Sequence, residues 1–108
     1  MKFGLRNSDI DEIGRIMKRF PEVDMALIFG SRAVGNYRHG SDVDIALKGS
    51  DVDFEITSKI AGILNGDTLM PYRFDVLDYN GLKNDDLREH IDRVGLPLYG
   101  HGHHVGID

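Results

Sequence analysis

The residues best suited to chemistry are two aspartates separated by a single residue, Asp42 and Asp44. They lie in residues 42–47, where polar and apolar side chains alternate as in a β-strand. This period places both carboxylates on one face, about 7 Å apart. Two anions this close repel, by about 4 kcal/mol at 4 Å and an effective dielectric constant of 20, so the pair indicates a cation between them. The alternative is the solvated polar face of an edge strand.

The composition limits which cation such a pair could bind. The sequence contains no cysteine, so a metal ion would be held by oxygen or imidazole, and carboxylate oxygens favour Mg²⁺ or Mn²⁺. An EF-hand calcium loop needs a glycine at its sixth position, where this chain has Leu47. The acids of residues 51–55 are assigned to the start of the following helix and receive no catalytic role.

A third aspartate, Asp75, lies between Phe74 and Val76 in a strand-like segment, residues 72–77. Its side chain would point away from its two apolar neighbours and would join the pair if the two strands were adjacent. Three carboxylates around one point can hold two divalent ions about 3.5 to 4 Å apart, which is the arrangement used in phosphoryl transfer. The alternative is a lone aspartate at a solvent-facing strand end.

A phosphate-binding turn is predicted at Gly30 and Ser31. They follow an apolar segment of strand length, residues 23–29, and begin a short helix. Unpaired backbone N–H groups, the helix dipole, the Ser31 hydroxyl and the Arg32 guanidinium would all favour an anion there. By itself the signal is weak, because a simple strand-to-helix turn capped by serine has the same sequence.

The elements that must position these groups alternate between helix and strand. Helical spacing of apolar residues, strand-like alternation and turn residues mark their limits. The predicted order is helix 8–20, strand 23–29, helix 31–34, strand 42–47, helix 53–64, strand 72–77, helix 85–94 with Asn84 or Asp85 as its cap, and strand 96–99.

Length and charge exclude several classes of protein. The chain has 108 residues and a net charge of -5, which suits one small domain, expected over residues 1–99, and argues against sequence-independent nucleic acid binding. No segment resembles a signal peptide or a membrane span, so a cytoplasmic protein is expected. Residues 100–108 are expected to form a flexible, solvated tail rich in glycine and histidine.

The combined motif resembles the nucleotidyltransferase superfamily of DNA polymerase beta. It consists of Gly30–Ser31 after an apolar strand, Asp42 and Asp44 in the next strand, and Asp75 in a later one. More narrowly, FGSRA at 29–33 and SDVDIA at 41–46 look like the minimal nucleotidyltransferases, the MNT antitoxins encoded beside HEPN-domain toxins. The resemblance covers nearly the whole chain. It implies an α+β fold with a small mixed β-sheet and helices packed on one face.

The resemblance also implies roles for individual residues. Gly30, Ser31 and Arg32 would bind the nucleotide, Asp42 and Asp44 would bind both of two Mg²⁺ ions, and Asp75 would complete the ion that activates the acceptor. Mn²⁺ could replace Mg²⁺.

The sequence departs from the family pattern at Val34, where many relatives have a basic residue. The triphosphate charge would then depend on Arg32, Arg38 or Lys48.

Three functions remain open at this point. The first is an antitoxin that transfers AMP from ATP to a hydroxyl, expected to be a tyrosine of a HEPN toxin partner. The second is a non-catalytic antitoxin that neutralises its partner by complex formation, and the third is transfer to a small molecule such as an aminoglycoside. The three aspartates together with Gly30–Ser31 favour the first, because a pure binding module has no physical need for converging anions. Homo- and hetero-oligomers both remain open.

Overall fold

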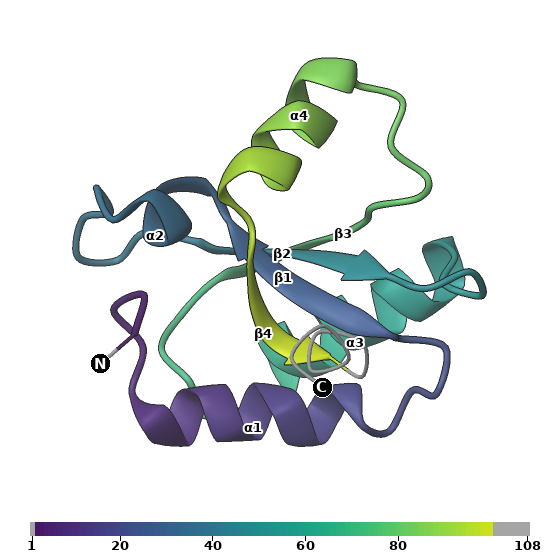
Figure 1. Ribbon diagram of the computed structural model, residues 1–108. Helices are drawn as coiled ribbons and strands as arrows, with labels where there is room; N and C mark the ends of the chain where they lie inside the picture. The colour runs from purple at the N-terminus through teal and green to yellow at the C-terminus, as the bar shows by residue number, and fades with distance from the viewer. Residues whose placement is uncertain (1, 101–108) are drawn as a thin grey trace, which may run out of the picture.

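The computed structural model describes residues 2–100 and contains one four-stranded sheet with helices on both sides (Figure 1). The predicted order of elements is confirmed. It runs α1 (Asn7–Met17), β1 (Met25–Phe29), α2 (Gly30–Val34), β2 (Val43–Lys48), α3 (Phe54–Gly66), β3 (Phe74–Asp78), α4 (Asp85–Val94) and β4 (Leu96–Gly100).

The boundaries differ most between the first helix and the first strand. The helix ends at Met17 and the strand begins at Met25, because the chain between them forms successive turns. The backbone N–H of Phe20 donates to the Met17 carbonyl, and that of Val23 donates to the Phe20 carbonyl. At the last helix, the Asn84 side chain accepts a hydrogen bond from the backbone of Leu87, which confirms the predicted cap.

The sheet is mixed, as predicted, and has the strand order β3-β2-β1-β4. β1 pairs antiparallel with β2 and with β4, whereas β2 pairs parallel with β3 through the crossover helix α3. β1 is therefore central and is apolar on both faces, whereas β3 is an edge strand.

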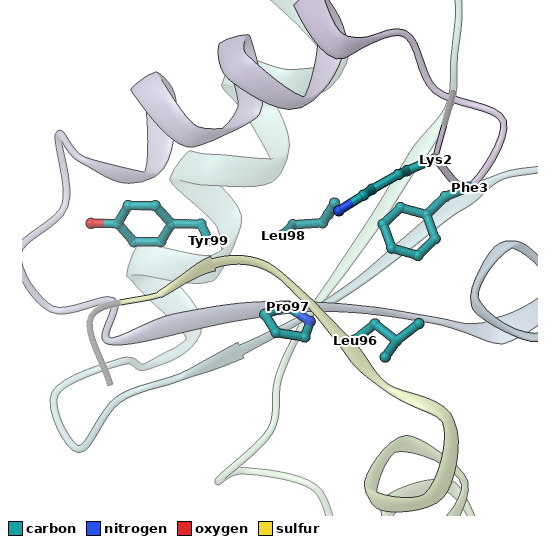
Figure 2. A pocket seen from close by; sticks show the side chains of 6 residues that line it. All are labelled: Lys2, Phe3, Leu96, Pro97, Leu98 and Tyr99. Atoms are coloured by element: carbon teal, nitrogen blue, oxygen red, sulfur yellow. The ribbon is translucent and has the colours of Figure 1, made fainter. Parts of the chain in front are cut away.

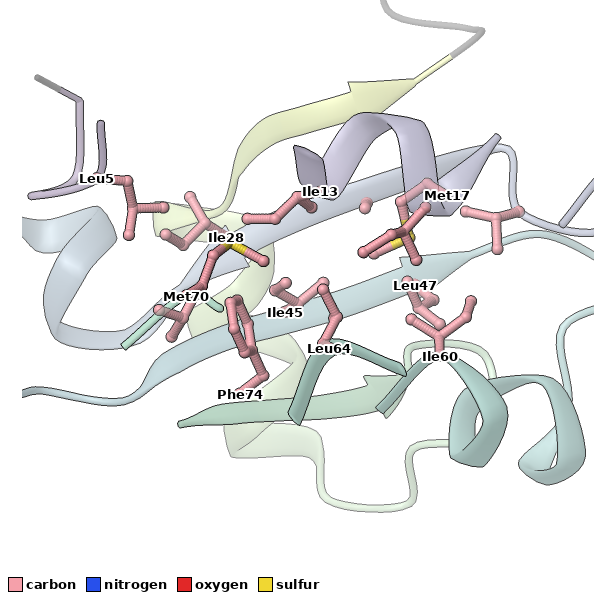
Figure 3. Close-up of a cluster of buried hydrophobic side chains, with 14 of the residues drawn as sticks. Leu5, Ile13, Met17, Ile28, Ile45, Leu47, Ile60, Leu64, Met70 and Phe74 are labelled. Atoms are coloured by element: carbon pink, nitrogen blue, oxygen red, sulfur yellow. The ribbon is translucent and has the colours of Figure 1, made fainter. Parts of the chain in front are cut away.

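The main core fills the space between the sheet and the pair α1 and α3 (Figure 3). Alternate residues of β2 point into it, as the strand period requires. Its fully buried side chains include Ile13, Met17, Ile28, Ile45, Leu47, Ile60 and Leu64.

The opposite face carries a smaller core under α4, so the helices are not all packed on one face as predicted. Ile91 of α4 packs with Leu27, Phe29 and Ala46. Helical spacing gives α4 one apolar side, and the second apolar face of β1 is the surface that this side can cover. Ala46 is completely buried here, so the small residue gives room to the helix.

A buried carboxylate, Asp9, ties the start of α1 to the segment before β3. Asp9 is 2% exposed. Arg6 donates to both of its carboxylate oxygens, and the Tyr72 hydroxyl donates to Oδ2 at 2.8 Å. Burial by itself would raise the pKa of Asp9, but the hydrogen bonds from Arg6 and Tyr72 outweigh it and lower that pKa.

We expect Tyr72→Phe to lower the free energy of unfolding by about 1.5 to 3 kcal/mol at pH 7, the usual cost of a hydrogen bond to a charged group. A lowered carboxyl pKa stabilises the fold above the unfolded-state value of 3.8, and this stabilisation is lost as the pH falls through the folded-state pKa. The difference between the proteins should therefore shrink in urea titrations as the pH is lowered below 4. An equal difference at all pH values would assign the effect to packing instead.

Two sequence predictions concern features outside this core. None of the helices within residues 2–100 is long and apolar enough to cross a membrane. The predicted tail, with His101, His103 and His104, lies outside the described residues except for Gly100, which belongs to β4.

Candidate active site

Three neighbouring strands place the candidate residues in one row across the sheet. Phe29 at the end of β1 pairs with Asp44 of β2, and Asp44 pairs with Asp75 of β3. Adjacent strands lie about 4.8 Å apart, so the Asp44 backbone is that close to both neighbours. The two aspartate-bearing strands are adjacent, so the condition under which Asp75 joins the pair is met. Asp42 lies just before β2, two residues from Asp44 and on the same face.

Gly30 follows Phe29 and lies directly against the side chain of Asp44. Its φ of +73° lies in the left-handed region that favours glycine. A Cβ atom added at Gly30 would collide with Oδ2 of Asp44. The turn and the carboxylate are therefore in immediate contact, and any larger residue at this position would require one of them to move.

The three carboxylates differ in exposure and in their electrostatic surroundings. Asp42 and Asp75 are exposed, whereas Asp44 is partly buried. Burial raises the pKa of Asp44 above its usual value, and the negative charges of Asp75 and Asp42 raise it further. His90 and Arg32 act in the opposite direction on this pKa. Asp44 is thus the centre of a repulsive anionic cluster of Asp42, Asp44 and Asp75, which we call the acid row.

The donor chemistry of this cluster suits a divalent cation, because carboxylate oxygens are the ligands that Mg²⁺ and Mn²⁺ prefer. Within residues 2–100, however, no three His, Cys, Asp or Glu side chains are arranged to hold a metal ion. Asp42 lies 4.0 Å from Arg73, with both side chains more than half exposed, and such surface pairs contribute little energy. The residue types fit the metal, and side-chain rotation would have to bring them together.

At neutral pH we expect Asp44→Asn to be slightly more stable than the wild type, by less than about 1 kcal/mol, because asparagine removes the repulsion. A raised folded-state pKa means that ionising Asp44 opposes folding. The contribution of Asp44 to wild-type stability should fall as the pH rises from the unfolded-state pKa of 3.8 through the folded-state pKa. The stability difference between Asp44→Asn and the wild type should disappear below that pH range in denaturant titrations. The matched control is Asp51→Asn, which changes an exposed acid outside the cluster.

His90, which belongs to none of the sequence motifs, contacts the turn from the side of α4. The backbone N–H of Gly30 donates to Nε2 of His90 at 3.2 Å. The imidazole also packs edge-to-face on the Phe29 ring, with centroids 6.2 Å apart. The sequence did contain one indication of this position. His90 lies three residues after Leu87 and four before Val94, and this spacing places it on the apolar side of α4, which faces the sheet.

Ser31, by contrast, begins the turn as predicted. Its hydroxyl makes no hydrogen bond within the described part of the chain, so it can donate to an incoming group.

Arg32, which was predicted to contact the nucleotide, is already held by the protein backbone. It is 4% exposed, and its guanidinium donates to the carbonyl oxygens of Phe3, Ser41 and Asp42. These bonds would have to break before the group could reach a phosphate at Gly30. The geometry favours a structural role for Arg32 over the predicted nucleotide contact.

The other two predicted phosphate contacts, Lys48 and Arg38, lie in different parts of the molecule. Lys48 lies at the far end of β2, with its ammonium 4.4 Å from the centre of the Tyr79 ring. Arg38 is exposed in the loop before Asp42, and its side chain has no partner among residues 2–100. Of the three predicted phosphate contacts, Arg38 is therefore the one whose side chain is free among residues 2–100.

Two cavities lie near the N-terminal segment rather than on the acid row. One of about 560 Å³ lies beside the edge strand β4 and is lined by Lys2, Phe3, Leu96, Pro97, Leu98 and Tyr99 (Figure 2). A second, of about 490 Å³, lies beside the loop that leads to Asp42, and Arg32, Tyr37, Arg38 and Tyr72 contribute to its lining. None of the three candidate aspartates lines either cavity.

Comparison with known proteins supports the architecture described above. A family model described as polymerase beta, nucleotidyltransferase matches residues 11–103, whereas no curated protein sequence matches. The chain is similar to a solved toxin-antitoxin structure with AMP-PNP, with a TM-score of 0.70, 22% identity, and coverage of 95% of this chain and 80% of that chain. At this identity the similarity establishes the fold alone.

Two further solved structures show the same likeness. For the toxin-antitoxin MntA-HepT the TM-score is 0.62 at 19% identity, covering 94% of this chain and 79% of that one. For a protein from Shewanella oneidensis the TM-score is 0.63 at 18% identity, with the same coverage of both chains.

Proposed function

The chain belongs to the polymerase beta nucleotidyltransferase family, and we propose that it transfers AMP from ATP to a hydroxyl group, specifically to a tyrosine of a HEPN-domain toxin. The observation that carries this proposal is the row across three strands. Gly30 lies against Asp44, and Asp44 pairs with Asp75. The turn that is predicted to bind phosphate and the acidic cluster thus share one end of the sheet.

In this proposal the three aspartates would together bind two Mg²⁺ ions. Asp42 and Asp44 would contact both ions, and Asp75 would contact the one beside the acceptor. When bound, divalent cations neutralise phosphate charge and favour loss of the acceptor's proton. The central position of Asp44 between its two neighbours suits a ligand shared by both ions.

The turn would position the donor nucleotide. Phosphate oxygens would accept hydrogen bonds from the Ser31 hydroxyl and from backbone N–H groups, including that of Gly30. Because the Gly30 N–H already bonds to His90, the phosphate would replace the imidazole as its acceptor. The acceptor oxygen then forms a bond to the α-phosphorus while the bond to pyrophosphate breaks, and the hydroxyl proton passes to water.

The choice of partner rests on the similarity to two toxin-antitoxin structures, one of which contains AMP-PNP. A cytoplasmic setting is part of the proposal, because a chain without cysteines suits a reducing compartment. No direct contact with nucleic acid is proposed, given the net charge of -5.

The experiment is to incubate the protein with labelled ATP, Mg²⁺ and the product of the adjacent gene, and then to weigh that product. A mass increase of one AMP, confined by peptide mapping to a tyrosine, is the expected result. Omitting Mg²⁺ should prevent it, and Asp51→Asn, an exposed acid outside the row, should transfer as the wild type does.

The second candidate function is neutralisation by complex formation alone. It is favoured by the absence, within residues 2–100, of three side chains already arranged to hold a metal ion. In that case the partner would lose activity at equal stoichiometry without gaining mass, and ATP would have no effect on the neutralisation.

A further inference from the structure

Arg32 is a buried cation whose hydrogen-bond partners are all neutral. Its Nη2 and Nε donate to the Ser41 carbonyl at 2.7 and 3.1 Å, and Nε also lies 3.3 Å from the Asp42 carbonyl. Nη1 donates to the Phe3 carbonyl at 2.8 Å. The guanidinium carbon lies 5.2 Å from the ring centres of both Tyr37 and Tyr72.

This arrangement fixes the backbone directly before β2. Two of the three carbonyl groups belong to Ser41 and Asp42, the last residues of the loop and the start of the acid row. The positive charge also acts on the row itself, because Arg32 lowers the pKa of Asp44 against the effect of its acidic neighbours. A guanidinium presents five donors in a rigid fork that spans these separate carbonyls, whereas a lysine offers three donors on one compact ammonium.

We propose that Arg32 is a positioning residue that holds the Asp42 backbone in place and thereby strengthens the binding of divalent cations by the acid row. The inference rests on the proposed function, which supplies the cation, and it replaces the phosphate contact expected for this residue. Partners that orient metal ligands typically change metal affinity by 10- to 100-fold when they are removed.

The test measures Mn²⁺ binding to the full chain without nucleotide, by calorimetry and by electron paramagnetic resonance. Arg32→Lys should weaken binding by about 10-fold or more, although the net charge is unchanged. Amide hydrogen exchange should become faster at Ser41 and Val43 but remain unchanged in β1. The matched control is Arg15→Lys, an exposed arginine of α1, which should leave Mn²⁺ affinity unaltered.

If Arg32→Lys does not fold, a second variant tests whether Arg32 strengthens Mn²⁺ binding. Tyr37→Leu removes one ring from the guanidinium but leaves the carbonyl contacts, and Tyr37 is 37% exposed. Loss of one cation–π contact should weaken Mn²⁺ binding about 2- to 5-fold.

Mn²⁺ affinity that is equal in wild type and Arg32→Lys overturns the proposal, and so does weaker ATP binding with unchanged Mn²⁺ binding, which would restore the phosphate contact. Failure of the proposed function has a different signature. In that case Mn²⁺ binding would still depend on Arg32, but no partner protein would gain AMP.

Discussion

If the proposed function is correct, Asp44→Asn is expected to reduce nucleotidyl transfer by at least about 10³-fold while the protein remains folded, because it would weaken a ligand shared by both metal ions. Asparagine has the same shape as aspartate but carries no charge and offers a single oxygen. The measurement is the initial rate of AMP transfer to the partner, followed by mass spectrometry at saturating ATP and Mg²⁺.

The same variant separates catalysis from binding. If Asp44→Asn still neutralises the partner at normal stoichiometry, complex formation is sufficient and the enzymatic proposal is contradicted. Asp51→Asn changes the net charge equally but lies outside the row, so it controls for long-range electrostatic effects on the encounter. Retention of most of the transfer activity by Asp44→Asn would also remove Asp44 from the site.

Gly30→Ala is expected to lower the transfer rate by about 100-fold, the scale that a 1 Å misplacement of a reacting group costs. The new methyl group would collide with Oδ2 of Asp44, so the carboxylate or the turn must move. An alanine at a φ of +73° also costs about 1 to 2 kcal/mol of stability. The rate assay and urea unfolding measure the two effects separately.

Two comparisons isolate the contact from the backbone conformation. Gly35 also has a positive φ, +100°, but nothing lies within 4 Å of an added Cβ, so Gly35→Ala should lose stability without the large loss of rate. In an Asp44→Ala background the collision is absent, and the stability cost of Gly30→Ala should fall to that of the φ angle. Equal costs in both backgrounds would disprove the contact.

Short-range pattern was sufficient to predict most of this fold. The alternation around Asp42 and Asp44 identified β2 and its acidic face, because side chains two residues apart must share a face of a strand. The single aspartate between Phe74 and Val76 identified β3 for the same reason. Periodicity does not show which face of the sheet each helix covers. The family resemblance implied helices on one face, whereas α4 covers the other face.

The surroundings of the site depended on contacts that no local pattern contains. Arg32 bonds to the Phe3 carbonyl 29 residues away, and Gly30 bonds to His90 at a separation of 60 residues. Sequence spacing could identify an arginine after the turn but not the neutral oxygens that surround it. The predicted phosphate ligand therefore lies among backbone carbonyls, and His90 occupies the place beside the turn.

Because β3 is an edge strand, Asp75 lies in a part of the sheet that opens more easily than the part that carries Asp44. Asp44 belongs to the interior strand β2 and Asp42 directly precedes that strand, whereas Asp75 lies in a five-residue strand paired along one side only. Fraying of that margin would detach a single carboxylate and leave the remaining pair in place. A ligand that contacts both Asp44 and Asp75 would then stabilise the pairing of β2 with β3. Without it, activity would be lost on warming at a temperature below that at which the rest of the domain unfolds.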